Sequence, residues 1–140
     1  MARKKRKGTE LSVFKGREAK LNRAILHSLS LGGPQTAYNL LKNLRKTKTL
    51  RQTHYGNVNK RIRALGKAGY VRIVEKQKTK AGFEAPVYEL KEKAHLAMIL
   101  DAIDLEELLD RVNDEIALEL TVVIAVLRQI RLSYSGGALF

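Results

Sequence analysis

The segment LRQTHYGNVNKRIRALGKAGYV, residues 50–71, carries the pattern from which the rest of the chain can be interpreted. Val58, Ile62 and Leu65 are spaced i, i+4 and i+7, which places them along one stripe of a helix. Amide and cationic side chains occupy the remaining positions, namely Asn57, Asn59, Lys60, Arg61 and Arg63. The segment therefore predicts a helix over about residues 55–68 with an apolar back and a cationic, amide-bearing front.

A β-hairpin is predicted directly after this helix. Gly69 can adopt the left-handed conformation that ends a helix, and the β-favouring residues of 70–76 follow it. Residues 77–82 form a loop with lysines, and residues 83–90 form the returning strand. Pro86 cannot donate a ladder hydrogen bond, so we expect an edge strand there.

Two further helices are predicted before residue 50. Apolar residues at helical spacing indicate a first helix over 17–31, and Gly32, Gly33 and Pro34 end it. The second helix is predicted over about 34–46, with Pro34 in its first turn. Residues 47–53 are polar and basic and serve as the turn that leads to the third helix. Leu11, Val13 and Phe14 favour a short strand or turn near the start of the chain.

The C-terminal part of the sequence returns to a helical pattern after Lys91. Asp104 and Glu107 match a capping box, which predicts one long helix over about 105–132. Its apolar stripe is longer than the domain should need, so we interpret it as a dimer interface. A helix that folds back on its own domain is the alternative. The stripe consists of Leu105, Leu108, Leu109, Val112, Ile116, Leu120, Val123, Leu127 and Ile130.

Length and charge limit the class of protein. The 140 residues suffice for one domain with an appended element, and the formal net charge is +13. Residues 1–100 contain 24 Lys or Arg against 6 Asp or Glu, whereas residues 101–140 contain 3 against 8. A body with eighteen excess positive charges favours nucleic acid as partner, with an anionic membrane surface second. The sequence has no long cationic amphipathic helix that would favour the membrane.

The chain begins with a basic run that we interpret as a flexible arm. It consists of Arg3, Lys4, Lys5, Arg6 and Lys7. Such a run is either a solubilising tail or an arm that lies along DNA phosphates or in a minor groove. The predicted organisation is an arm at 1–16, a helical domain with the hairpin at 17–100 and a helical dimerisation segment at 101–140. The absence of an apolar leader and of a membrane-length apolar run predicts a cytoplasmic, nucleoid-associated location.

Three stretches resemble the winged helix-turn-helix family. They are V-N-K-R-I-R-A-L-G-K-A-G-Y-V at 58–71, GGPQTAYNLL at 32–41 and VYELKEKA at 87–94. The second and third are similar to PadR-type and MarR-type regulators, although Lys91 replaces their usual threonine. The resemblance implies a mainly α fold with a small β-hairpin wing (α+β) and a long C-terminal helix. It also implies binding of double-stranded DNA, with helix 55–68 in the major groove and the wing, residues 76–82, on backbone or minor groove.

Candidate DNA-binding residues follow from this resemblance. Asparagine, glutamine and arginine can make bidentate contacts with base edges, and wing lysines suit phosphates. At or near the third helix the candidates are Gln52, Thr53, His54, Tyr55, Asn57, Asn59, Lys60, Arg61 and Arg63. On the wing they are Lys76, Lys78 and Lys80.

Other functions receive less support from the sequence. It has no cysteine, no glycine-rich phosphate loop and no hydrolase motif, so we predict no enzyme, cofactor or metal site. An RNA-binding or protein-binding winged-helix module is possible, but the eight aromatic residues are few for stacking on unpaired bases. Within DNA binding, a dimeric transcriptional regulator, commonly a repressor, is favoured over a plasmid-partition or chromatin-architectural protein.

Overall fold

The computed structural model describes the backbone of residues 11–135 and the side chains of residues 11–129. The chain divides after Ala102 into two compact units, and each is described by itself.

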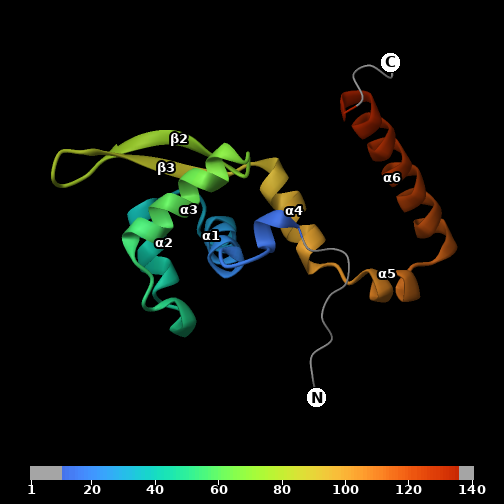
Figure 1. Cartoon of the computed structure of the whole chain (residues 1–140), viewed down its shortest axis with the longest axis horizontal. Coiled ribbons are helices and arrows are strands. Elements are labelled where there is room, and N and C mark those ends of the chain that lie inside the picture. The colour runs from blue at the N-terminus through green and yellow to red at the C-terminus, as the bar shows by residue number, and fades with distance from the viewer. Residues whose placement is uncertain (1–10, 136–140) are drawn as a thin grey trace. The chain divides into compact units, whose positions relative to one another are not determined.

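Helices form most of the first unit (Figure 1). They are η1 (Ser12–Phe14), α1 (Ala19–Gly32), α2 (Ala37–Leu44), η2 (Lys48–Leu50), α3 (Tyr55–Lys67) and α4 (Glu92–Ala102). Helices α1, α2 and α3 enclose the core, where Ile25, Leu26, Leu40, Val58 and Ile62 are fully buried. Each helix contributes side chains from one face, as their apolar spacing predicts.

The sheet has three strands, not the two that the sequence predicted. They are β1 (Gln35–Thr36), β2 (Val71–Lys78) and β3 (Glu84–Leu90), in the antiparallel order β1-β3-β2. The short β1 pairs with Tyr88 and Val87 of β3. Helix α2 therefore begins later than expected, at Ala37, and the Thr36 side chain caps it by accepting a hydrogen bond from the backbone N–H of Asn39 at 3.2 Å.

The prediction of an edge strand at Pro86 is wrong for β3 as a whole, because β3 is the central strand. However, β1 is only two residues long and reaches Val87 and Tyr88. Pro86 lies just beyond this pairing and has Lys76 of β2 as its partner. Within the described residues, one side of β3 is thus open at Pro86, which is where a residue without an N–H is tolerated.

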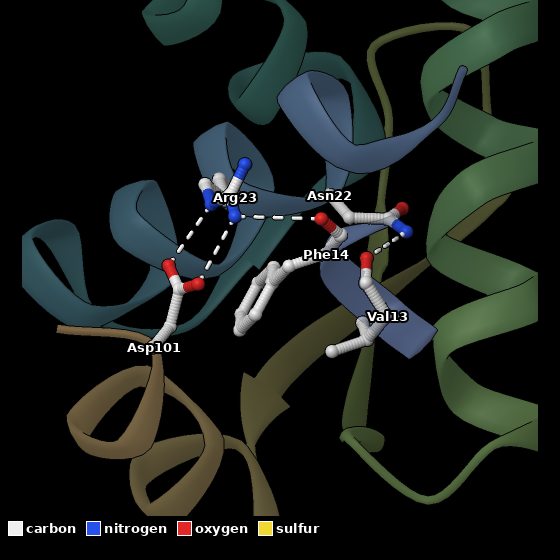
Figure 2. Close-up of polar contacts among 5 residues, drawn as sticks. All are labelled: Val13, Phe14, Asn22, Arg23 and Asp101. Atoms are coloured by element: carbon white, nitrogen blue, oxygen red, sulfur yellow. Dashed lines mark hydrogen bonds and ion pairs between the residues drawn. The ribbon is translucent and has the colours of Figure 1, made fainter. Parts of the chain in front are cut away.

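The folded unit begins before residue 17, the boundary expected from the sequence. Val13 and Phe14 are buried in the core, and the Asn22 amide donates to the carbonyl oxygen of Val13 at 2.8 Å. Arg23 donates to both carboxylate oxygens of Asp101, at 2.9 and 3.0 Å, and to the carbonyl oxygen of Phe14 at 3.4 Å (Figure 2). This pair joins α1 to the end of α4, and the guanidinium also covers the Phe14 ring at 5.0 Å.

The second unit contains α5 (Leu105–Arg111) and α6 (Asp114–Ser135), so the prediction of one continuous helix is wrong. Val112 is extended, and the Asn113 side chain accepts a hydrogen bond from the backbone N–H of Ile116 at 2.8 Å. Asn113 thereby starts a new helix, as asparagine commonly does at this position. The predicted cap at Asp104 is confirmed, since its carboxylate accepts from the N–H of Glu107 at 3.2 Å.

Candidate nucleic-acid interface

Helix α3 is packed on one face and closed by a glycine cap at its C-terminal end. His54 is extended and precedes the first turn, and Val58, Ile62 and Leu65 are buried. Gly69 adopts a φ of 88°, and the N–H of the following residue, Tyr70, reaches the carbonyl oxygen of Leu65 at 2.9 Å. The predicted helix, its buried stripe and its glycine cap are confirmed, so the orientation of its polar side chains about the helix axis is fixed by the core.

The polar side chains of α3 divide into a front and two flanks. Successive residues are about 100° apart on a helix, so Lys60 and Arg63 lie opposite the buried stripe, and both are exposed. Asn59 and Asn57 lie on opposite flanks of this front. Arg61 does not belong to the front, because its side chain is only 20% exposed and its Nε lies 3.7 Å from a carboxylate oxygen of Glu18.

A groove of about 710 Å³ lies between helix α2, the wing and the flank of α3 that carries Asn59. We define the wing as the hairpin formed by β2 and β3 with the turn between them (Figure 1). Aromatic and cationic side chains line this groove together: Tyr38, Lys42, Tyr55, Asn59, Lys78, Lys80 and Tyr88. The Lys42 ammonium lies 5.7 Å from the centre of the Tyr38 ring. We call this space the wing groove.

A second hollow, of about 400 Å³, lies on the other flank of α3 against α1 and the turn before α3. We call it the α1 hollow. Its lining has one acid, Glu18, and includes the polar and cationic residues Arg17, Lys20, Gln52, Thr53, Asn57, Lys60 and Arg61. Helix α3 is therefore a ridge between two depressions with basic walls.

Several cations of the first unit already have partners in the folded chain. Arg23 pairs with Asp101, and Arg72 pairs with Glu89 at 2.7 Å. Lys93 donates to the carbonyl oxygen of Ala68 at 2.8 Å. These groups are occupied in stabilising the fold.

Other cations have no acidic partner within the part of the chain that the structure describes. In the wing groove they are Lys42, Lys78 and Lys80, and in the α1 hollow they are Arg17, Lys20 and Lys60. Arg63 and Lys67 on α3 are exposed as well. Each depression beside the ridge thus has three cations that remain available for an anionic ligand.

Tyr88 lies at the base of the wing groove. Burial raises the pKa of its phenol above the ordinary value of 10.0, and the positive charge of Arg63 partly opposes this change. The phenol is therefore neutral at physiological pH and adds no negative charge to the groove. It can act there as a hydrogen-bonding group or as part of the wall.

The residues predicted as DNA contacts are distributed unevenly over this surface. The wing groove includes Tyr55, Asn59, Lys78 and Lys80, and the α1 hollow includes Gln52, Thr53, Asn57, Lys60 and Arg61. Arg63 lies on the exposed front, and His54 is exposed at the start of α3. Lys76 lines a smaller hollow beside Pro34 and Asn39 instead of the wing groove. The arm residues Arg3, Lys4, Lys5, Arg6 and Lys7 lie outside the described residues.

The sequence interpretation missed Arg17, Lys20, Tyr38, Lys42 and Lys67. For Tyr38 and Lys42 a signal was available, since they are four residues apart and fall on one exposed face of α2. For Arg17 and Lys20 the position depends on how α1 packs against α3, which residue spacing does not show.

The apolar residues of the second unit are largely exposed within the single chain. Leu105, Leu108, Leu109, Val112 and Leu120 line a hollow of about 800 Å³ between α5 and α6. Ile116, Val123 and Leu127 are exposed elsewhere on α6. The side chain of Ile130 lies outside the described residues. Among the helices described, none is long and apolar enough to cross a membrane.

Three helices followed by a wing that flanks the third define the winged helix-turn-helix fold, with a further helical unit after Ala102. The fold class expected from the sequence is confirmed, with a third strand added to the sheet.

Three solved structures are similar to this chain at low sequence identity. PadR of Bacillus subtilis, solved in complex with operator DNA, has 17% identity and a TM-score of 0.46, covering 86% of this chain and 75% of PadR. TA0346 of Thermoplasma acidophilum, a candidate transcriptional regulator, has 20% identity and a TM-score of 0.43, covering 65% and 94%. The C30S mutant of ZitR from Lactococcus lactis has 17% identity and a TM-score of 0.40, covering 82% and 78%. No family model and no curated protein matches the sequence.

Proposed function

We propose that this protein is a dimeric transcriptional regulator that binds specific sites on double-stranded DNA through α3. The observation that carries the proposal is the ridge between two basic depressions. A helix with its side chains is about 10–12 Å across, and the major groove of DNA is about 12 Å wide. When α3 lies in the major groove, one DNA phosphate backbone borders it on each side. These two backbones then face the available cations of the wing groove and of the α1 hollow.

Sequence specificity is assigned to the side chains of α3 that lie nearest the base edges. Arg63 lies on the exposed front, and the two asparagines, Asn57 and Asn59, flank it. Arginine can make a bidentate contact with guanine and asparagine with adenine. Arg61 is left out of this set because it is turned toward Glu18.

The dimer is proposed to form between the second units of two copies. Helix α6 has one apolar face along the hollow that it forms with α5, including Leu120 and Ile124, and Val122, Val123 and Val126 are exposed on other faces. A helix with apolar residues on more than one face needs a covering surface beyond the one that α5 supplies. The excess of acidic over basic residues in 101–140 disfavours DNA as the cover, and a second copy of the same apolar surface fits it.

Such a dimer presents two α3 helices to successive major grooves. A two-fold axis then favours a palindromic site with half-sites about 34–36 Å apart, or about 10 base pairs. Occupying the site excludes other proteins from the same DNA, which is the simplest form of repression.

Selection of bound duplexes from a random pool tests this function. The full-length protein is expected to enrich one palindromic motif, and Arg63→Gln is expected to lose preference at one position of each half-site. Arg111→Gln is the matched control, since it removes the same charge from α5. If the wild-type chain binds duplexes but enriches no motif, the result assigns an architectural function in place of a regulatory one. If it binds no duplex, the proposal fails.

Light scattering on the full-length chain tests the dimer. Val123→Glu introduces a charge into the exposed apolar surface of α6 and is expected to yield monomers. Leu31→Glu is the control, because Leu31 is also an exposed apolar residue but lies in the first unit, at the end of α1. A monomeric wild type, or a Val123→Glu variant that remains dimeric, would overturn this part of the proposal.

A further inference from the structure

Phe83 lies in the turn of the wing, and 73% of it is exposed. The turn is closed by its own hydrogen bonds. The N–H of Thr79 donates to the carbonyl oxygen of Phe83 at 2.7 Å, and the N–H of Phe83 donates to the Thr79 hydroxyl oxygen at 3.2 Å. Gly82 takes a φ of 84°, and its N–H reaches the carbonyl oxygen of Thr79 at 3.0 Å. The backbone that carries the Phe83 ring is therefore held in place.

The surroundings of Phe83 are cationic. Lys78 is the last residue of β2 and Lys80 lies in the turn, and neither has an ion-pair partner among the described residues. The cross-strand neighbour of Lys78 is Glu84, which is the one acid next to the turn. A single exposed apolar residue is ordinary on a protein surface. An exposed aromatic ring on a turn beside two lysines without ion-pair partners is a less ordinary combination, since the lysines attract a polyanion and the ring adds an apolar contact to it.

The wing is long enough to reach a neighbouring groove of DNA. Toward the turn, Tyr88 is the last residue of β3 that belongs to the core cluster; it pairs with Ile73 of β2, and the ladder continues to Lys78. Five residues at about 3.3 Å each give a reach of about 17 Å beyond that point. Half of a 34–36 Å helical turn is also about 17 Å, which is the spacing between a major groove and the next minor groove. Figure 1 shows the hairpin extending past α2 and α3.

We propose that Phe83 is a wedge that enters the minor groove beside each half-site and partly unstacks one base step. Lys78 and Lys80 hold the phosphates on either side of that step. Apolar wedges of this kind kink DNA by roughly 20–90° and favour flexible pyrimidine–purine steps such as TA or CA. The inference rests on the proposed function, because α3 must be in the adjacent major groove. It adds a specificity-determining residue outside α3.

The test measures DNA bending by fluorescence energy transfer between dyes at the two ends of a short duplex. The duplex carries the sequence selected by the wild-type protein, and the full-length protein is used. Wild type is expected to bend it, whereas Phe83→Ala is expected to leave it straight and to bind about tenfold more weakly. Phe83→Leu retains an apolar wedge and is expected to retain the bend. Leu31→Ala removes another exposed apolar residue and is expected to change nothing.

Both Phe83 variants keep the backbone hydrogen bonds of the turn, so folding is not at risk. A Phe83→Ala variant that bends and binds the duplex like wild type overturns the wedge while the proposed function stands. A wild type that fails to bind any duplex is a failure of the proposed function itself. Binding to vesicles of anionic lipid that depends on Phe83, in the absence of Phe83-dependent DNA bending, would assign the wing turn to a membrane surface and overturn the inference.

Discussion

Replacing Lys78 by glutamine should reduce the salt dependence of DNA binding, whereas replacing Arg72 should not. Both residues lie on β2, and both changes remove one positive charge. Lys78 is exposed in the wing groove without an acidic partner in the described structure. The Nε of Arg72 lies 2.7 Å from Glu89, and this hydrogen bond raises the pKa of Arg72. The two variants therefore change the net charge equally, but one removes an available cation and the other removes a cation that is already paired.

The size of the effect follows from the two depressions beside α3. Each has three available cations, and if two of the three reach phosphates, a dimer makes about eight contacts. The slope of log K against log salt is then about −7, which corresponds to a loss of roughly 10⁴ in affinity between about 50 and 200 mM salt. Lys78→Gln removes two contacts from the dimer and should make the slope shallower by about 1.8.

Fluorescence anisotropy with an end-labelled duplex, measured at several salt concentrations, yields these slopes. Lys78→Gln should lose about 12-fold less affinity than wild type over the same fourfold increase in salt. Arg72→Gln should retain the wild-type slope. Equal slopes for the two variants would show that net charge alone governs binding and would refute the division into available and occupied cations.

Three further predictions concern the stability of the fold, each measured as the free energy of unfolding in urea. Asp101→Asn should cost about 1 kcal/mol, because it removes the ion pair between the partly exposed Arg23 and Asp101; an unchanged free energy of unfolding would show that this pair does not stabilise the first unit. Asn113→Ala should cost about 1 kcal/mol in the second unit by removing the cap on Ile116, with no change in the first. Folding favours the protonated phenol of Tyr88, whose pKa is raised, so this stabilisation is present below pH 10 and lost as the pH rises through the folded pKa. Tyr88→Phe should therefore lose less stability than wild type at alkaline pH, and parallel curves would contradict this.

The parts of the fold that were predicted correctly depend on local sequence. The apolar stripe of α3 and the glycine at position 69 lie within one short segment, and both have the predicted conformation. Strand β1 was missed because it exists through pairing with β3, which lies some fifty residues further along the chain. The break before α6 is a different case, because the local sequence does indicate it. Asn113 followed by two acidic residues is typical of a helix start, but the apolar pattern continues across it and led to the prediction of one helix.

The sequence predicted a basic surface around α3 but not which cations are available on it. The positions of the few acidic residues in the fold determine this. With 24 basic and 6 acidic residues in the first 100, the acids decide which cations are occupied. The ion pairs of the described core take arginines, Arg23, Arg61 and Arg72, whose planar fork fits a carboxylate. The partners are as far as 78 residues apart in sequence, so only the folded chain reveals them. Lysines, which fit this geometry less well, remain on the surface, and the available charge on both sides of α3 is therefore mostly lysine.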